Sequence, residues 1–536
     1  MGRAVLPLVR AAFFSICYKG EMGMENKREC GVLLPVSSLP SKYGIGCFDK
    51  SAYEFVDFLA AAGQSCWQIL PLGPTGYGDS PYQSFSTFAG NPYFISLDDL
   101  IEEGVLKRQE CRSVNFGEDP SSVDYEKLYN GRLKLLHKAY ERSDVIHNEA
   151  FLRFQEEEGY WLKDYALFMA VKDRFGGAPW TEWAEDIRLR WQYALDYYRR
   201  ELYFDIEFQE YLQFKFYEQW RKLKAYANEK GIQIIGDIPI YVAMDSADTW
   251  ASPWLFKLDE DNYPTLIAGC PPDGFSATGQ VWGNPLYNWE VHRQSGFAWW
   301  LRRVEHCFGM YDILRIDHFR GFDEYYAIPY GDKTAENGWW EKGPGMDLFR
   351  AISTHLGEKE IIAEDLGFVT ESVRQLVRDS GYPNMKVLEF AFDSRDTGSA
   401  VDYFPHNYLR NSVAYTGTHD NETLMGWLKG IPDNEKEMVR RYLNRHDASD
   451  EELCENMICL TLMSVSKLAI IPMQDYLGLD NSARINQPST SGKNWKWRLL
   501  PGQADHSLCE RMHSLAVVYG RKSQETMNSG DVEVIW

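Results

Sequence analysis

One stretch of this sequence combines a buried strand with residues that could do chemistry. Residues 312–322 read Asp-Ile-Leu-Arg-Ile-Asp-His-Phe-Arg-Gly-Phe, and the apolar positions at its start are typical of a strand in a parallel sheet. Asp317 ends the apolar part, and Arg315, two residues earlier, shares its face of the strand. An arginine there favours the ionised form of the carboxyl group. Because Arg-x-Asp pairs are often only structural ion pairs, a catalytic Asp317 requires other carboxylates close by.

Three further runs repeat the pattern of apolar residues followed by an acidic one. They cover residues 232–237, 360–365 and 412–420. In a (β/α)8 barrel the carboxyl ends of the strands meet at one face, where catalytic groups gather. The four runs therefore predict a single acidic pocket. Within it, Asp237 and Asp365 are better explained as structural residues than as chemical ones.

The elements that must position these residues alternate between short strands and helices. This pattern predicts an α/β fold of the (β/α)8 TIM-barrel class, with extended loops at the C-terminal face of the barrel. The expected barrel strands are residues 30–36, 66–72, 232–237, 312–317, 360–365, 385–390, 413–416 and 468–473.

The chain between these strands divides into a catalytic barrel and additions to it. Residues 30–520 are expected to form the barrel, and the alternation stops over 94–230, where aromatic residues at helical spacing predict a helical insertion after the second strand. The Gly-, Pro- and aromatic-rich segment 268–289 is typical of an ordered flap. Residues 1–29 only loosely resemble a signal peptide, so we interpret them as a non-core extension. Residues 521–536 are expected to be a tail.

Composition excludes several classes of partner. Lys and Arg number 56 against 78 Asp and Glu, which gives a net charge of -22 and argues against nucleic acid and anionic membranes. The ten cysteines include no CxxC pair, and this favours reduced thiols in a cytoplasmic protein. His318 and His419 adjoin carboxylates, but their spacing fits no familiar metal motif, so no metal is expected.

Carboxylates on separate strand ends, with aromatic neighbours, suit the cleavage of glycosidic bonds. One carboxylate attacks the anomeric carbon while a second, protonated, gives its proton to the leaving oxygen. Asp317 beside Arg315 is the expected nucleophile. Glu364 follows an apolar run and has Asp365 as a like-charged neighbour, which should raise its pKa and suit it to the acid/base role, although a cap or salt bridge would also explain it. Three aromatic residues are expected to stack on sugar faces: Tyr82, Phe275 and Trp282.

Several motifs together carry a resemblance to a known family. They are Leu-Arg-Ile-Asp-His-Phe-Arg-Gly (314–321), Ala-Glu-Asp-Leu-Gly (363–367), Thr-Gly-Thr-His-Asp-Asn (416–421), Asp-Ser-Pro-Tyr (79–82), Pro-Pro-Asp-Gly-Phe-Ser (271–276), Trp-Gly-Asn-Pro-Leu-Tyr (282–287) and Asn-Trp-Lys-Trp-Arg (494–498). The sequence resembles the 4-α-glucanotransferases called amylomaltases or disproportionating enzymes, which form glycoside hydrolase family 77 of the α-amylase superfamily. The similarity extends from about Cys30 to the C-terminal helix.

The resemblance implies roles for particular residues. Asp317 would be the nucleophile, Glu364 the general acid/base, and Asp420 a third carboxylate that grips the sugar at the point of cleavage. It also implies a protein without a cofactor and without the C-terminal β-domain of ordinary amylases. The expected substrate-binding residues are Arg315, His318, His419, Trp282, Tyr82, Ser80, Asp273, Phe275, Gln280 and Asp237.

The sequence therefore predicts a cytoplasmic enzyme that cleaves an α-1,4-glucan and passes the fragment to the 4-hydroxyl of another glucan or of glucose. Two alternatives stay open. A maltodextrin hydrolase would use the same residues with water as acceptor. A catalytically idle glycan-binding barrel is a different class, and three intact carboxylates argue against it. Oligomeric state, donor length and cyclic products are not predicted.

Overall fold

Eight parallel strands close into a barrel at the centre of the molecule. The computed structural model describes residues 27–76, 78–272, 276–367, 369–394, 400–490 and 492–522. Around the barrel the strands follow the order β1-β12-β11-β10-β9-β6-β3-β2. Their bounds are β1 (Glu29–Leu33), β2 (Cys66–Gln68), β3 (Gln233–Pro239), β6 (Ile313–Asp317), β9 (Ile361–Ala363), β10 (Asn384–Val387), β11 (Ser412–Tyr415) and β12 (Leu468–Pro472). All eight begin within a residue of where the sequence predicts them, although several end two to four residues from the predicted end, and the closed ring confirms the (β/α)8 TIM barrel.

Amphipathic helices cover the outside of the barrel. In α15 (Glu371–Ser380), Thr370 caps the first turn, Gly381 ends the helix at φ 73°, and the apolar face is buried. The other helices of this layer also bury apolar residues, and several of them begin with a side-chain cap. They include α2 (Lys50–Ala61), α13 (Ala298–Met310), α14 (Met346–Leu356), α16 (Ala400–Tyr403), α17 (Leu424–Gly430), α18 (Asp433–Leu443), α19 (Asp450–Met463), α20 (Met473–Tyr476) and α21 (His506–Val518).

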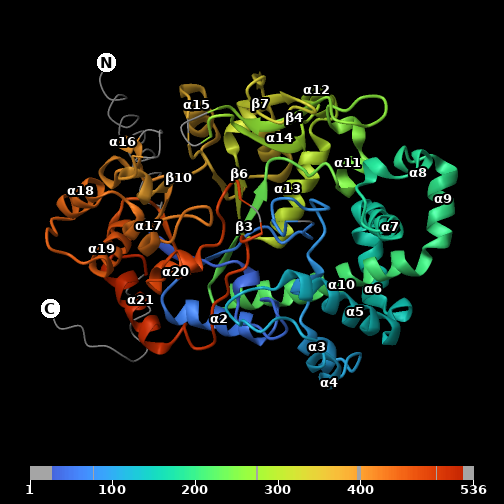
Figure 1. Ribbon diagram of the computed structural model, residues 1–536, viewed down its shortest axis with the longest axis horizontal. Helices are drawn as coiled ribbons and strands as arrows, with labels where there is room; N and C mark the ends of the chain where they lie inside the picture. Colours follow the sequence, from blue (N-terminus) through green and yellow to red (C-terminus); the bar gives the residue numbers. More distant parts are fainter. Residues whose placement is uncertain are drawn as a thin grey trace, which may run out of the picture.

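A large helical insertion follows β2 and lies to one side of the barrel, opposite the C-terminal helices (Figure 1). Its longest helix, α10 (Tyr203–Glu229), packs against the barrel helices α2 and α13. Trp220 of α10 is fully buried and donates its indole N–H to the Met310 carbonyl of α13 at 3.0 Å. The aromatic residues of the insertion therefore build its core, as predicted. The other helices are α3 (Leu97–Glu102), α4 (Arg108–Arg112), α5 (Tyr125–Arg142), α6 (Glu149–Glu157), α7 (Gly159–Arg174), α8 (Glu185–Arg188) and α9 (Gln192–Glu201).

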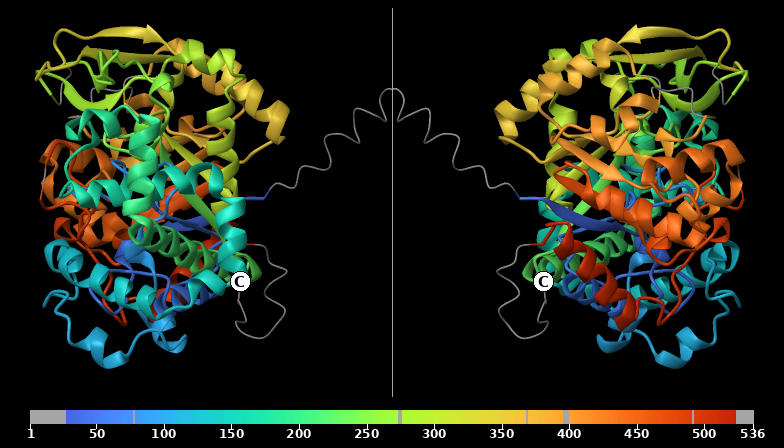
Figure 2. Two further views of the ribbon diagram at one scale, coloured as in Figure 1. Left: turned by 90° about the vertical axis from the view of Figure 1, so that its right-hand side faces the viewer. Right: turned by 90° about the vertical axis from the view of Figure 1, so that its left-hand side faces the viewer.

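A separate four-stranded antiparallel sheet, which the sequence did not predict, lies at one end of the molecule. Its order is β5-β4-β7-β8, and Figure 2 shows its yellow-green strands opposite the blue helices at the other end. Two of its strands lie in the segment predicted as a flap, whose residues 273–275 fall outside the described chain together with the predicted Asp273 and Phe275. The elements are β4 (Leu266–Cys270), β5 (Gln280–Pro285), β7 (Glu324–Pro329) and β8 (Trp339–Lys342), with the neighbouring helices α11 (Ala247–Ala251) and α12 (Trp289–Gln294).

The two ends of the described chain meet where the barrel closes. β1 pairs in parallel with β12, joining the first and last barrel strands. Arg28 and Arg521 both donate to the carbonyls of Leu462 and Ser464, and Arg521 also reaches the Glu29 carbonyl. The folded unit therefore includes both arginines, which the sequence reading placed in the terminal segments.

Two further observations bear on the predicted class of protein. No described helix is both long enough and apolar enough to cross a membrane. The nine described cysteines are all free thiols, and most are buried.

Candidate active site

A cleft of about 1040 Å³ opens at the carboxyl ends of the barrel strands. β6, β9 and β11 each deliver a predicted carboxylate there, and β5 forms part of one wall. The structure thus gathers residues from distant parts of the chain into one site. The predicted site residues that line it are Ser80, Tyr82, Gln280, Trp282, Arg315, Asp317, His318, Glu364, His419 and Asp420.

Asp317 ends β6 and is held by the arginine predicted to accompany it. Arg315 Nη2 lies 3.0 Å from Asp317 Oδ1, while Arg315 Nη1 lies 2.6 Å from Asp237 Oδ2. Burial raises the pKa of Asp317 to about 6, and Arg315 opposes this rise. The sequence analysis considered only the effect of Arg315, so the pKa of Asp317 is higher than predicted. The carboxyl group is nevertheless ionised above about pH 6.

Glu364, just after β9, is held by two backbone amides. His318 N donates to Oε2 at 2.6 Å, and Leu366 N donates to Oε1 at 2.8 Å. Burial and the nearby charge of Asp317 raise the pKa of Glu364 to about 7, although both amides and Arg315 oppose the rise. A carboxyl group with this pKa can act as a proton donor near neutral pH.

The neighbour that raises the pKa of Glu364 is not the one predicted. Asp365 was expected to act on it as an adjacent like charge. Instead, Asp365 accepts from the Asn384 side chain at 3.0 Å and from Met385 N at 3.2 Å, on strand β10. Successive residues of an extended chain point to opposite sides, so Asp365 faces away from the cleft while Glu364 faces into it.

Asp420 follows β11 and is kept ionised by its neighbours. Its Oδ1 accepts from Asn486 Nδ2 at 2.6 Å, and its Oδ2 lies 3.3 Å from His419 Nε2. Burial alone would raise the pKa of Asp420, but the His419 ring and the Asn486 amide hold it below its ordinary value. With 43% of its side chain exposed, Asp420 offers the cleft a charged acceptor for sugar hydroxyls.

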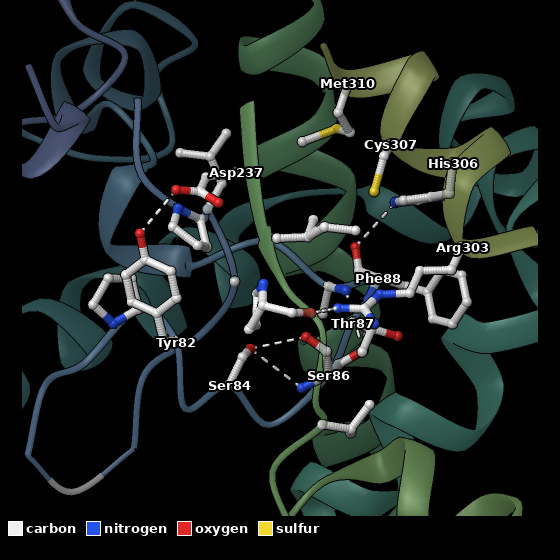
Figure 3. A pocket seen from close by; sticks show the side chains of 18 of the residues that line it. Tyr82, Ser84, Ser86, Thr87, Phe88, Asp237, Arg303, His306, Cys307 and Met310 are labelled. Carbon is white, nitrogen blue, oxygen red and sulfur yellow. Dashed lines mark hydrogen bonds between the residues drawn. The ribbon is translucent and has the colours of Figure 1, made fainter. Parts of the chain in front are cut away.

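Tyr82 forms the floor of the cleft. Its hydroxyl donates to Asp237 Oδ2 at 2.9 Å (Figure 3). Its ring stacks on that of His419 with 5.2 Å between centroids. Asp237 is completely buried and does not line the cleft, because Arg315 and Tyr82 cover it. It was predicted to bind substrate, but its contacts are those of a residue that positions Arg315. A small cavity of about 60 Å³ lies behind this pair, between Tyr82 and Arg303.

The opposite wall is aromatic and comes from the sheet that the sequence did not predict. Trp282 of β5 packs edge-on against the His318 ring, with 4.9 Å between centroids, and donates to Gln280 Oε1 at 3.1 Å. His318 itself has a left-handed backbone with φ 53°, and this turn aims its amide at Glu364. Trp282 is half-buried, so part of its ring is available for a sugar face.

Sequence reasoning missed several residues that line or support the cleft. Asn486 and Trp495 come from the loop after α20, and the Trp495 ring lies 5.9 Å from that of Tyr82. Glu389 and Asn421 lie beside the Asp420 loop and bond to each other at 3.1 Å. Trp495 and Asn421 lie within the motifs that carry the family resemblance, so the sequence could have identified them as site residues. No local sequence pattern marks Asn486 or Glu389.

The described residues contain no group of three or more His, Cys, Asp or Glu side chains that could hold a metal ion. The two histidines of the cleft are engaged otherwise, with His318 against Trp282 and His419 between Tyr82 and Asp420. The cleft offers carboxyl groups and aromatic rings to a ligand.

A TIM barrel with carboxyl groups of unequal pKa at adjacent strand ends defines an enzyme class that acts on glycosidic bonds. The family model described as 4-alpha-glucanotransferase, Glyco_hydro_77, matches residues 34–503. The chain belongs to this family and is an enzyme of the 4-alpha-glucanotransferase type.

Individual relatives are similar to this chain over nearly its whole length. A 4-alpha-glucanotransferase of Streptococcus pneumoniae is 49% identical over 505 residues, 94% of this chain and 99% of the relative. One of Thermus thermophilus is 45% identical over 502 residues, 92% of this chain and 99% of the relative. The solved structure of an amylomaltase from Streptococcus agalactiae in complex with acarbose has a TM-score of 0.89 and 42% identity, covering 93% of this chain and all of that one.

Proposed function

We propose that this 4-alpha-glucanotransferase uses Asp317 as nucleophile, Glu364 as acid/base and Asp420 as a sugar-binding carboxylate. The observation that carries the proposal is the bond from His318 N to Glu364, because His318 directly follows Asp317. This bond sets the nucleophile and the proton donor side by side at one end of the barrel. Retaining glycosidases use two carboxyl groups in this way.

The reaction consists of two displacements at the anomeric carbon. Asp317 attacks and forms a glycosyl ester, while Glu364 gives its proton to the leaving glycosidic oxygen. In the second step Glu364 takes the proton of an acceptor 4-hydroxyl, whose oxygen displaces Asp317. Asp420, held by Asn486, bonds sugar hydroxyls and so stabilises the flattened ring of the transition state.

The substrates that fit this cleft are α-1,4-glucans, with a second glucan or glucose as acceptor. Support comes from the aromatic wall at Trp282, from the half-exposed Asp420, and from a solved relative that is an acarbose complex. We assign the predicted span of residues 30–520, extended to Arg28 and Arg521, to the catalytic barrel, with the insertion at about 94–230 and the flap at 268–289 beside its mouth. The predicted contacts of Asp273 and Phe275 belong to this proposal.

We also propose that the protein acts in the cytoplasm. The support is the free state of the nine described cysteines, because secreted proteins commonly pair their thiols. The net charge of -22 speaks against nucleic acid and anionic membrane surfaces as partners.

Incubation with maltotriose separates transfer from hydrolysis. A transferase yields glucose together with longer maltodextrins, while the number of reducing ends stays nearly constant. Trp282→Ala should shift the balance toward hydrolysis, because an acceptor that is poorly placed competes less well with water. The control is Trp339→Ala, on the far edge strand β8. A steady rise in reducing ends with the unmodified protein, and no product longer than maltotriose, would assign a hydrolase.

A further inference from the structure

Glu389 is a buried acidic residue that the proposed reaction does not use. It lies in the 3-10 turn η7 (Leu388–Ala391) at the end of β10, between the strands that carry Glu364 and Asp420. Only 2% of the residue is exposed. Its Oε1 is shielded from solvent and has no hydrogen-bond partner among the described residues. A buried acid in such a position requires a physical explanation.

The contacts of Glu389 are with the segment that carries Asp420. Its Oε2 accepts from Asn421 Nδ2 at 3.1 Å, and its backbone N–H donates to the Thr416 carbonyl at 3.2 Å. Its Oε1 lies so close to Gly417 that a Cβ there would be 3.0 Å away. The glutamate therefore supports residues 416–421 at three points.

Asn421 transmits this support to Asp420. Its Oδ1 accepts from Thr418 N at 3.0 Å and from Thr418 Oγ1 at 2.8 Å. Asp420 N in turn donates to Thr418 Oγ1 at 3.3 Å. A continuous set of hydrogen bonds thus runs from Glu389 through Asn421 and Thr418 to the backbone of Asp420.

The surroundings of Glu389 disfavour a negative charge on it. Asp475 of α20, Glu422 after the Asp420 segment and Asp393 after η7 face it, together with the thiol of Cys454 on α19. Burial, followed by the charges of Asp475 and Glu422, raises the pKa of Glu389 well above its ordinary value of 4.5.

Asp475, the neighbouring buried acid, accepts more hydrogen bonds than Glu389 does. Asp475 accepts from Thr416 Oγ1 at 2.6 Å and from Leu424 N at 2.8 Å, whereas Glu389 accepts from one side-chain amide. When two buried carboxyl groups compete, the one with more donors ionises and the other keeps its proton. Neither oxygen of Glu389 accepts from a Lys, Arg or His in the described part of the chain.

We propose that Glu389 is a positioning residue that acts as a neutral carboxylic acid, holding the 416–421 segment so that Asp420 faces the substrate. It acts on the Asp420 segment through Asn421 and Thr418 and takes no part in the bonds that form or break. The expected effect of Glu389 on activity rests on the proposed role of Asp420. The expected effect of Glu389 on stability does not.

The test compares three replacements of Glu389. Glu389→Gln keeps the shape and the acceptor of a neutral acid, so kcat should stay within about 2-fold of the unmodified enzyme. Glu389→Ala removes the oxygen that accepts from Asn421, and the shorter side chain of Glu389→Asp moves it out of reach. In both variants kcat should fall about 10–100-fold with a smaller change in KM. If Glu389→Ala does not fold, the glutamine variant and the stability measurement below still decide.

Stability against pH separates a neutral acid from a charged one. A carboxyl group with a raised pKa in the folded state keeps its proton while the unfolded chain loses it above about pH 4.5, so the unmodified protein loses stability as pH rises from there. An amide has no such loss. The melting temperature of Glu389→Gln relative to the unmodified protein should therefore increase by about 1–3 °C between pH 5 and pH 8.

The exposed Glu229→Gln serves as control, since it makes the same change in formal charge and should show no such increase. A Glu389→Gln protein that is less stable at every pH, with no gain toward pH 8, would overturn the proposal. So would a glutamine variant as inactive as the alanine one. If Asp420 does not bind sugar, only the activity results would differ from those expected here, and the stability results would not.

Discussion

His318 donates its backbone N–H to Glu364, with 2.6 Å between the nitrogen and Oε2. Because His318 is the residue after Asp317, this bond couples the two strand ends that carry the proposed nucleophile and the proposed acid. The charge on Asp317 then contributes to the raised pKa of Glu364. The two carboxyl groups therefore titrate as a pair, and a measured pH profile reports the pair.

The activity should have a narrow pH optimum between about 6 and 7. Below pH 6 Asp317 gains a proton and no longer attacks, and above pH 7 Glu364 loses the proton that it must donate. The measurement is kcat/KM for maltotriose from pH 4 to 10. A rate that continued to rise above pH 9 would contradict the acid role of Glu364.

Asp317→Asn should fold normally and lose transfer by roughly 10⁴-fold or more, because an amide cannot form the glycosyl ester. The rate of maltotriose disproportionation and the melting temperature are measured together. The exposed Asp447→Asn, which makes the same chemical change away from the cleft, should keep full activity. Appreciable turnover by a pure Asp317→Asn preparation would remove the assignment.

Glu364→Gln should slow natural glucans by roughly 10²–10⁴-fold, since the leaving oxygen then departs without a proton. A donor with fluoride as leaving group needs no such proton, so the glycosyl-enzyme should still form. The rate of this step in Glu364→Gln should also no longer fall at alkaline pH. The burst of fluoride release measures this step. Equal loss with both donors would indicate a binding or structural role.

Asn486→Ala should reduce kcat by about 10–100-fold and affect KM less. The amide lies 2.6 Å from Asp420 Oδ1, and a hydrogen bond to a charged group contributes about 1.5–3 kcal/mol. Asn494→Ala is the matched control, because Asn494 bonds to Gln487 and Thr490 of the same loop and not to Asp420. Equal losses in both variants would mean that the loop, and not the contact, was disturbed.

The barrel strands could be predicted because each is a short buried run of mostly apolar residues, and four of these runs end in acidic residues. The carboxylates that we propose to be catalytic stand at three of those ends, so the same signal indicated Asp317, Glu364 and Asp420. The antiparallel sheet gave no such signal. Strand β8 has mostly exposed residues, and β5 is half-buried or exposed over its first four residues, so neither shows the alternation of a half-buried strand.

The remaining errors concern contacts between distant parts of the chain. Asn486 reaches Asp420 because its backbone N–H bonds to the His419 carbonyl at 3.1 Å, a pairing that no local pattern encodes. Asp365 was taken as the neighbour of Glu364 because the two are adjacent in sequence, although their side chains diverge. Asp237 was given a substrate contact, and only the structure shows that Tyr82 and Arg315 cover it.

The meeting of the chain ends at β1 and β12 has a consequence for biosynthesis. During synthesis the amino-terminal part leaves the ribosome first, and domains generally fold as units. β1 can pair with β2 early, but its other edge stays open until β12 and Arg521 have been made. We therefore expect closure of the barrel to be among the last steps of folding, so that a nascent protein carries one unpaired edge of β1 until β12 has left the ribosome.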